Sequence, residues 1–215
     1  MFKWNKVHNI ASPFRMMNTK PKNTEERIRE AARVVFTKKG YAATRTRDIA
    51  EAAGLNLSLL NYYFRSKEKL FELVMMEKIA ELFGAMRLIV NNKTTTLAVK
   101  IEKIAATYID LLHRHPDLPI FVLSEIRNHP KDFAANTDLQ EVLKNASLMQ
   151  QLKAKRPDTN PIQFFLSLLG MTIFPYIVKP LLHTSEVTDE ANFERLMAAR
   201  KKMIPIWMNL MLEVG

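Results

Sequence analysis

The chain has 215 residues, of which 47% are hydrophobic, and its formal net charge is +10. This length and apolar content predict one or two compact domains and argue against a disordered chain. Cysteine is absent, which excludes disulfides, zinc–thiolate sites and cysteine nucleophiles.

The composition favours helices, because only 5 glycines stand against 12 methionines and 12 phenylalanines. The charge is unevenly placed. Residues 1 to 71 hold 15 Lys or Arg against 6 Asp or Glu, whereas the remaining residues hold 17 against 16. A basic module joined to a nearly neutral one indicates a polyanion-binding part attached to a body with another role.

Residues 1–22 carry five basic side chains, no acidic ones and no strong helix signal. We interpret them as a flexible basic arm. The arm could add phosphate contacts or reach a groove of DNA. Alternatively, translation starts at Met16 or Met17. Residues 1–22 also lack the apolar segment of a secretory signal, and no apolar run approaches the roughly 18 to 20 residues that cross a bilayer. We therefore expect a cytoplasmic protein with no membrane partner.

An amphipathic helix is predicted over about 24–39. Asn23 or Thr24 can cap its start, acidic residues occupy its first turn, and Gly40 can end it in a left-handed conformation. A second helix of about two turns follows, with Thr46 as its expected N-cap and Gly54 closing it. After a short turn, the segment LSLLNYYF predicts a third helix with Leu60 directed to the core. Two short helices around a tight turn indicate a helix-turn-helix.

Ser66 can cap a long helix from Lys67 to about Asn91, which would connect this unit to the rest of the chain. Because it is the only long element leading directly from the helix-turn-helix, we expect it to act as the lever in any signal between the two parts. Further helices are predicted near 95–114, 117–128, 137–154, 161–182 and 188–213. Three prolines in the last two apolar stretches are expected to kink or end their helices: Pro175, Pro180 and Pro205.

Residues 40–71 resemble the N-terminal signature of TetR-family transcriptional regulators. The shared steps include Gly40-Tyr41, Ile49-Ala50, Ala53-Gly54 and a Tyr-Tyr-Phe run at 62–64. Many ordered matches at fixed spacing are a more specific signal than a lone motif. The resemblance implies an all-α protein with an N-terminal three-helix helix-turn-helix DNA-binding domain over 23–71, followed by a C-terminal helical dimerisation and ligand-binding domain over 72–215.

The resemblance also implies which residues lie at or beside DNA-contacting positions: Thr44, Arg45, Thr46, Arg47, Leu57, Ser58, Asn61, Tyr62, Tyr63 and Lys67. Arg47 could read a guanine edge, and Asn61 could read adenine or contact a phosphate or water. Tyr63 could equally be core. Arg45, Leu59 and Asn61 depart from the usual family residues, so the operator sequence cannot be carried over.

Helices 161–182 and 188–213 are expected, by resemblance, to form a four-helix homodimer interface. Kinks in this region would leave room for a cavity that binds a small apolar or amphipathic effector. The residues expected to line it are Phe83, Met86, Tyr108, Leu112, Phe121, Phe165 and Met171.

No nucleophile elbow, phosphate loop or paired-carboxylate motif occurs. His113, His115 and His129 stand at predicted helix ends without a completing carboxylate, so we expect no metal, cofactor or catalytic site. The leading hypothesis is a ligand-responsive repressor that binds a palindromic operator as a homodimer. An activator, a membrane-surface protein that uses the basic arm, and a small-molecule carrier with a vestigial DNA-binding domain remain as alternatives.

Overall fold

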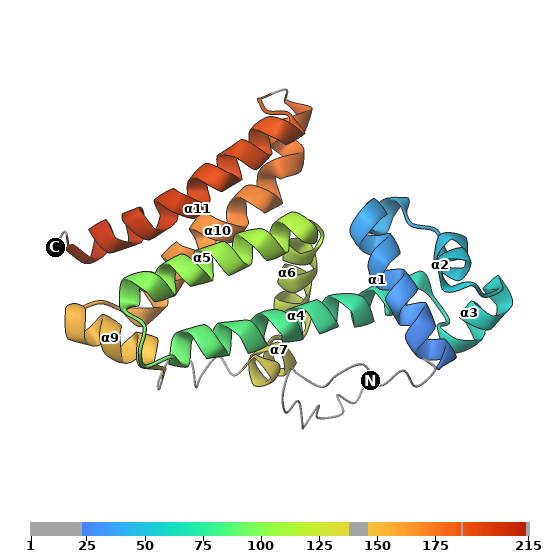
Figure 1. Ribbon diagram of the computed structural model, residues 1–215, viewed down its shortest axis with the longest axis horizontal. Helices are drawn as coiled ribbons and strands as arrows, with labels where there is room; N and C mark the ends of the chain where they lie inside the picture. The colour runs from blue at the N-terminus through green and yellow to red at the C-terminus, as the bar shows by residue number, and fades with distance from the viewer. Residues whose placement is uncertain (1–22, 138–145, 186, 214–215) are drawn as a thin grey trace.

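The computed structural model describes residues 23–137, 146–185 and 187–213, and within them it contains ten helices and no strand. The proposed arm, residues 1–22, lies outside the described residues. Three helices, α1 (Thr24–Ala43), α2 (Thr46–Ala53) and α3 (Leu57–Tyr63), form a unit that we call the head. The head stands at one end of the long helix α4 (Lys67–Asn91), as Figure 1 shows.

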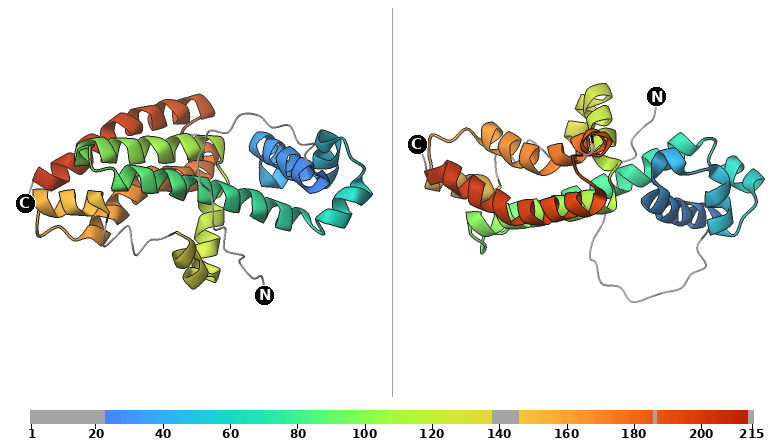
Figure 2. Two further views of the ribbon diagram at one scale, coloured as in Figure 1. Left: turned by 60° about the horizontal axis from the view of Figure 1, so that its bottom comes forward. Right: turned by 90° about the horizontal axis from the view of Figure 1, so that it is seen from above.

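The rest of the chain forms an elongated helical body: α5 (Leu97–Arg114), α6 (Leu118–Asn128), α7 (Pro130–Asn136), α9 (Ser147–Lys155), α10 (Pro161–Thr184) and α11 (Glu190–Glu213). Helix α5 is central, because it packs on α4, α9, α10 and α11. Helices α4, α5 and α11 run along the length of the body, and α6 crosses it near the head (Figure 2). The all-helical prediction is therefore confirmed.

The helix ends follow from local side-chain chemistry. The Asn23 side chain accepts a hydrogen bond from the Glu26 N–H at 2.8 Å, and Ser66 caps α4 by accepting from the Lys69 N–H at 3.3 Å. The N-cap of α2 is Arg45 rather than the expected Thr46, because the Asp48 carboxylate accepts the Arg45 N–H at 3.0 Å and fixes the first turn one residue earlier.

Two glycines have positive φ, as the sequence predicted for helix ends. Gly40 (φ 72°) breaks the regular part of α1, although a further turn extends the helix to Ala43. Gly54 (φ 64°, ψ 39°) ends α2 in the left-handed conformation and starts the turn of the helix-turn-helix.

Other predictions need correction. The helix expected over 137–154 is not one element: α7 ends at Asn136 and α9 begins at Ser147, with residues 138–145 outside the described part. Pro175 and Pro180 lie inside α10, and Pro205 lies inside α11, so none of them ends its helix, and of the two expected effects only a kink stays a prediction.

Helix α10 is long and apolar enough to cross a membrane by length and composition, with a mean hydropathy of 1.6 over its best window. This is weak evidence for a span, since buried and interface helices of soluble proteins pass the same test. One side of α10 packs on α5 and α11, while Leu166, Phe174 and Leu181 on its other side are exposed. The helix is therefore apolar on a face that the monomer leaves uncovered.

Gly54 and Gly84 give opposite predictions for stability. A Cβ at Gly54 would have a left-handed backbone and lie 3.4 Å from Arg27 Nη2, whereas a Cβ at Gly84, inside α4, would meet no atom within 4 Å. We expect Gly54→Ala to lower the free energy of unfolding by about 1 kcal/mol, and Gly84→Ala to raise it by about 0.5 to 1 kcal/mol. Urea denaturation at fixed protein concentration measures the free energy of unfolding of both variants. An equal effect of the two substitutions would contradict the conclusion that only Gly54 requires a left-handed backbone.

Candidate functional site

The head presents α3 outward from a compact base. Leu60 and Phe64 are buried, and the Asn56 side chain caps α3 by accepting the Leu59 N–H at 2.8 Å. The opposite side of α3 is open: Ser58 and Asn61 are exposed, and Tyr62 retains 80% of its surface. A helix held rigidly on one face and exposed on the other is what major-groove readout requires.

Tyr62 and Tyr63 meet edge to face, with ring centroids 5.4 Å apart. Tyr63 is more covered than Tyr62 but remains 42% exposed, so it is not a core residue of the monomer. The two phenol groups can pack on sugars and donate to phosphate oxygens.

The first turn of α2 lies beside this face in sequence and in space, since α2 packs on α3. Arg47 is exposed and Thr46 half-buried. The Arg45 N–H and then the Lys39 ammonium, 3.0 Å from Asp48 Oδ2, hold the pKa of the Asp48 carboxyl below its usual value. This ionised carboxylate fixes the start of α2 and therefore the direction in which Arg47 leaves the helix.

Two predicted DNA-contact residues also have structural roles. Thr44 is buried, and its hydroxyl donates to the Gly40 carbonyl at 2.6 Å. The Lys67 ammonium donates to the carbonyls of Tyr41 and Thr44 at 3.0 and 3.1 Å and lies 4.1 Å from the centroid of the Tyr41 ring. Lys67 thereby ties the end of α1 to the start of α4, at the edge of the candidate DNA surface.

Arg27 of α1 contacts the turn of the helix-turn-helix, and no local sequence signal indicates this role. Its Nη2 atom donates to the Ala53 carbonyl at 2.8 Å, next to Gly54. This bond satisfies a carbonyl at the end of α2 that has no acceptor role within the helix. Arg27 therefore links α1 to the end of α2, where the turn begins.

A second candidate site is an apolar cavity of about 260 Å³ in the body. Five of the residues predicted to line an effector pocket do line it: Phe83, Met86, Tyr108, Leu112 and Phe165. The other lining residues are Ile79, Leu82, Arg87, Val90, Ile104, Leu118, Pro119, Val122, Leu123, Ile126, Phe133, Thr137, Leu169 and Ile173, so α4, α5, α6 and α10 all contribute, together with α7 and the residue after it.

Phe121 and Met171 lie elsewhere. The Phe121 ring packs edge to face on Phe71 of α4, at 5.9 Å between centroids, and so faces the head rather than the cavity. The Met171 carbonyl accepts from Arg200 on α11, at 2.8 Å from Nη2. Helical spacing placed both residues on apolar faces but could not tell which neighbour each face meets.

The start of α6 contacts the head directly. Asp117, the N-cap residue of α6, does not cap its own helix; instead its Oδ2 atom accepts the Tyr41 N–H at 2.8 Å. His115 is buried next to Thr37, with 3.5 Å between Nδ1 and Oγ1, and burial followed by the nearby Lys78 charge lowers the His115 pKa. Five residues of α6 also line the cavity, so this helix contacts the cavity and, at its start, the head.

The histidines do not gather into a metal site. His113 lies 3.9 Å from a Glu194 oxygen, and His129 joins the end of α6 to the start of α7. Among the described residues, no group of three or more His, Cys, Asp or Glu side chains is placed to hold a metal ion.

Comparison with known proteins identifies the head. Residues 28–74 match the family model for bacterial regulatory proteins of the tetR family. The HTH-type transcriptional repressor KstR2 of Mycolicibacterium smegmatis is 29% identical over 103 residues, which cover 48% of this chain and 50% of the relative. The probable HTH-type transcriptional regulator YttP of Bacillus subtilis is 29% identical over 107 residues, with 48% and 51% covered. The chain thus spans about half the length of the curated relatives it matches.

Solved structures share the fold over most of the chain. A TetR/AcrR-family regulator from Thermobifida fusca superposes with a TM-score of 0.62 at 18% identity, over 86% of this chain and 97% of that one. Salmonella enterica GusR gives 0.57 at 17% identity, over 92% and 99%. Bacillus subtilis FadR, in complex with stearoyl-CoA, gives 0.52 at 17% identity, over 83% and 96%. At these identities the likeness concerns the fold alone. The match to the tetR family of bacterial regulatory proteins is therefore carried by residues 28–74, the helix-turn-helix region, and the solved structures extend the shared fold to the body.

Proposed function

We propose that this protein is a ligand-responsive transcriptional repressor that binds a palindromic or near-palindromic DNA operator as a homodimer in the cytoplasm. One observation carries the proposal: a single continuous helix, α4, begins under the exposed recognition surface of the head and then lines the apolar cavity of the body. In this assignment residues 23–71 are the DNA-binding domain and residues 72–215 the dimerisation and effector domain.

The DNA surface consists of the exposed side of α3 and the first turn of α2. Arg47 and Asn61 are the candidates for reading bases, because both are exposed and carry paired hydrogen-bonding groups. Thr46, Ser58, Tyr62 and Tyr63 suit sugar and phosphate contacts. Leu57, half-buried at the start of α3, can supply an apolar contact, while Thr44, Arg45 and Lys67 support the backbone at the edge of this surface.

An apolar stripe on α10 and α11 supports the homodimer. The exposed members are spaced three, four, seven or eight residues apart along each helix, so each set lies on one face. They are Ile162, Leu166, Phe174 and Leu181 on α10, and Leu196, Met203, Ile206 and Leu210 on α11. A contiguous apolar face of this kind is covered in most stable proteins. A second copy related by a twofold axis would cover it with the same face and would place two heads on related DNA half-sites.

The lining of the cavity favours an apolar or amphipathic effector, since nearly all its side chains are hydrocarbon or aromatic. FadR of Bacillus subtilis, which binds stearoyl-CoA in its structure, is an example of this fold with a long apolar chain as ligand. An effector changes DNA affinity only if it binds the two head arrangements with different affinity.

Two helices, α4 and α6, can couple effector binding in the cavity to the arrangement of the head. Helix α4 connects the cavity to the head covalently, and the Arg33 guanidinium of α1 pairs with Glu77 of α4 at 2.7 Å, so the head follows the first half of α4. Helix α6 adds the Asp117 bond to the Tyr41 N–H and the Phe121–Phe71 contact. A displacement of α6 by a ligand would therefore reach the head at Gly40, where α1 already departs from helical geometry.

The DNA assignment is tested by selecting binding sites from random duplex DNA. We expect a site with two related half-sites. Arg47→Ala should weaken binding by about 1 to 3 kcal/mol and relax the preference at one base position in each half-site. Lys93→Ala, an exposed cation in the segment between α4 and α5, is the control and should leave affinity and preference unchanged. A selection that recovers no preferred sequence would refute the proposal.

The dimer assignment is tested by charging the apolar stripe. Ile206 on α11 is 50% exposed in the monomer and Leu88 on α4 is 77% exposed. Ile206→Glu should convert the dimer to monomer and sharply reduce operator affinity, since a buried unpaired carboxylate is costly. Leu88→Glu should do neither. Sedimentation equilibrium measures the oligomeric state, and a dimer that survives Ile206→Glu would place the interface elsewhere.

The contact of α6 with the head is tested through the Tyr41 amide. Asp117→Ala removes the acceptor, whereas Asp117→Asn retains a side-chain oxygen. We expect Asp117→Ala to speed hydrogen exchange at the Tyr41 N–H by about tenfold, in keeping with the loss of a hydrogen bond to a charged group. Asp117→Asn should have a smaller effect. Equal exchange rates in the wild type and Asp117→Ala would show that this bond does not hold the head to α6.

A further inference from the structure

The cavity contains very few polar groups. Among its lining residues within the described part of the chain, only Arg87, Tyr108 and Thr137 carry a polar side-chain group. Arg87 is exposed to solvent and has interactions of its own. The Thr137 hydroxyl donates to the Ala134 carbonyl at 3.4 Å. Tyr108 is therefore the polar group whose surroundings are the cavity itself.

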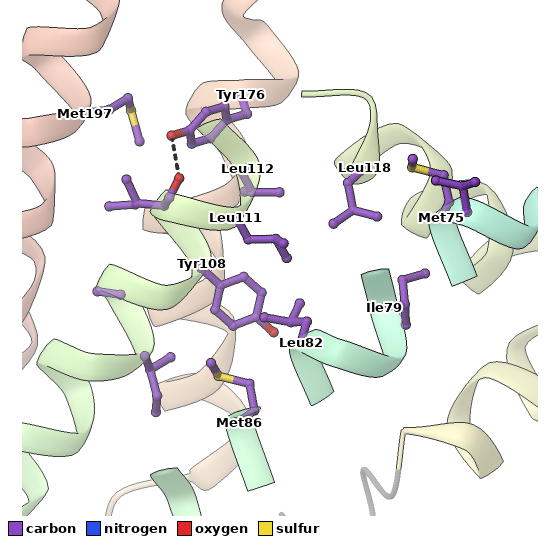
Figure 3. Packing of buried hydrophobic residues seen from close by; sticks show 14 of the residues in the cluster. Met75, Ile79, Leu82, Met86, Tyr108, Leu111, Leu112, Leu118, Tyr176 and Met197 are labelled. Carbon is purple, nitrogen blue, oxygen red and sulfur yellow. Dashed lines mark hydrogen bonds between the residues drawn. The ribbon is translucent and has the colours of Figure 1, made fainter. Parts of the chain in front are cut away.

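Two buried tyrosines of the same region differ in one respect. Tyr176 of α10 is 6% exposed, and its hydroxyl donates to the Ile109 carbonyl at 3.1 Å; Figure 3 shows this bond as a dashed line. Tyr108 of α5 is 8% exposed, and its hydroxyl has no hydrogen-bond partner among the described residues. In Figure 3 the Tyr108 side chain points from α5 toward Leu82 of α4, and both residues line the cavity.

The Tyr108 hydroxyl is not one of the side-chain polar atoms that are sealed off from solvent without a partner, and Tyr108 lines the cavity, so the hydroxyl opens on the cavity and is available to whatever fills it. A ligand oxygen suits this position, because a few precisely placed polar groups orient the ligand in an otherwise apolar pocket. Burial raises the pKa of Tyr108 to about 12, so its hydroxyl is uncharged at neutral pH and can donate a hydrogen bond.

We propose that the cavity takes an apolar molecule that carries one uncharged oxygen, such as a ketone, ester, thioester or alcohol, and that the Tyr108 hydroxyl recognises this oxygen. This inference rests on the proposed sensing function and names the chemical class of its effector. Tyr108 would set specificity, while the hydrocarbon lining would supply most of the affinity.

An uncharged oxygen fits this position better than a carboxylate. Within the described residues, the cavity wall offers a single cationic side chain, Arg87, which is exposed to solvent. A carboxylate placed beside Tyr108 would lose its hydration and gain only one neutral donor, which does not offset the cost of burying a charge. A ketone or ester oxygen loses much less on leaving water.

The test compares three bicyclic probes of similar size: tetralin, α-tetralone and naphthoate. Their binding to the full-length protein is measured by isothermal titration calorimetry. Tyr108→Phe removes only the hydroxyl oxygen from the cavity. We expect this substitution to weaken α-tetralone binding by about five-fold, the size of a typical net hydrogen bond, and to leave tetralin binding unchanged or slightly tighter.

Tyr176→Phe is the matched control, since it removes a buried hydroxyl that lies outside the cavity wall and already has a partner. It should leave the affinity for both probes unchanged but lower the melting temperature. Tyr108→Phe should not lower the melting temperature of the free protein. If Tyr108→Phe destabilises the protein as much as Tyr176→Phe does, the Tyr108 hydroxyl has a partner and the proposal fails.

The remaining outcomes separate the two proposals. Tetralin binding together with an unchanged affinity of Tyr108→Phe for α-tetralone would overturn the role of Tyr108 and leave the sensing function standing. Tighter binding of naphthoate than of α-tetralone, abolished by Arg87→Gln, would show that the ligand is an anion held at Arg87. If none of the three probes binds the wild-type protein, both the inference and the sensing function are refuted.

Discussion

Helix α4 contributes buried residues to the head and to the body within one continuous hydrophobic core, and the relation between head and body depends on this constraint. Its first turns place Leu70 and Val74 under the head, and its later turns place Leu82, Met86 and Val90 in the body. The helix is continuous over 25 residues. Because packed interiors respond to displacements of less than a side chain, neither head nor body can shift along α4 without repacking. In the proposed sensing function, this packing is the physical route by which a change at the cavity wall would reach the head.

The head is held against this helix by polar contacts as well as by burial. Lys67 and Arg27 both donate to backbone carbonyls near helix ends, where such carbonyls lack partners within the helix. Asp117 accepts an N–H of the head from the opposite direction, across 76 residues of sequence. Arg27 of α1 thus holds the end of α2 within the head, while Lys67 of α4 and Asp117 at the start of α6 hold the end of α1.

The body leaves an apolar face of α10 and α11 exposed. Helix α10 is apolar around nearly its whole circumference, yet only 28% of its most apolar window is buried within the monomer. The same stripe continues on α11. In water an apolar area of this kind favours association, with a free energy roughly proportional to the area covered. The homodimer proposed above is the arrangement that covers both helices with a single symmetric contact.

The sequence by itself determined most of the helices, many of their ends and the helix-turn-helix, but not α7 or the break between α7 and α9. Caps such as Asn23, Ser66 and Gly54 act within three or four residues, so their chemistry is readable from local sequence. The span of α4 could be predicted to the residue because a cap precedes it and a polar run follows it. Five of the seven residues predicted to line a cavity also do so, since apolar spacing shows which side of a helix is buried.

Only the tertiary structure decided what each buried face meets. Phe121 and Met171 stand on apolar faces like the true lining residues, but one packs against the head and the other lies beside α11. Asp117 has the position of an ordinary N-cap, and no local signal shows that its carboxylate reaches Tyr41 instead. Tyr108 was predicted to line a cavity, but its sequence position could not show that the Tyr176 hydroxyl has a carbonyl partner while the Tyr108 hydroxyl opens on the cavity. Helical periodicity specifies a direction relative to one helix axis, whereas partners across the core depend on how several axes pack, which no local stretch of sequence encodes.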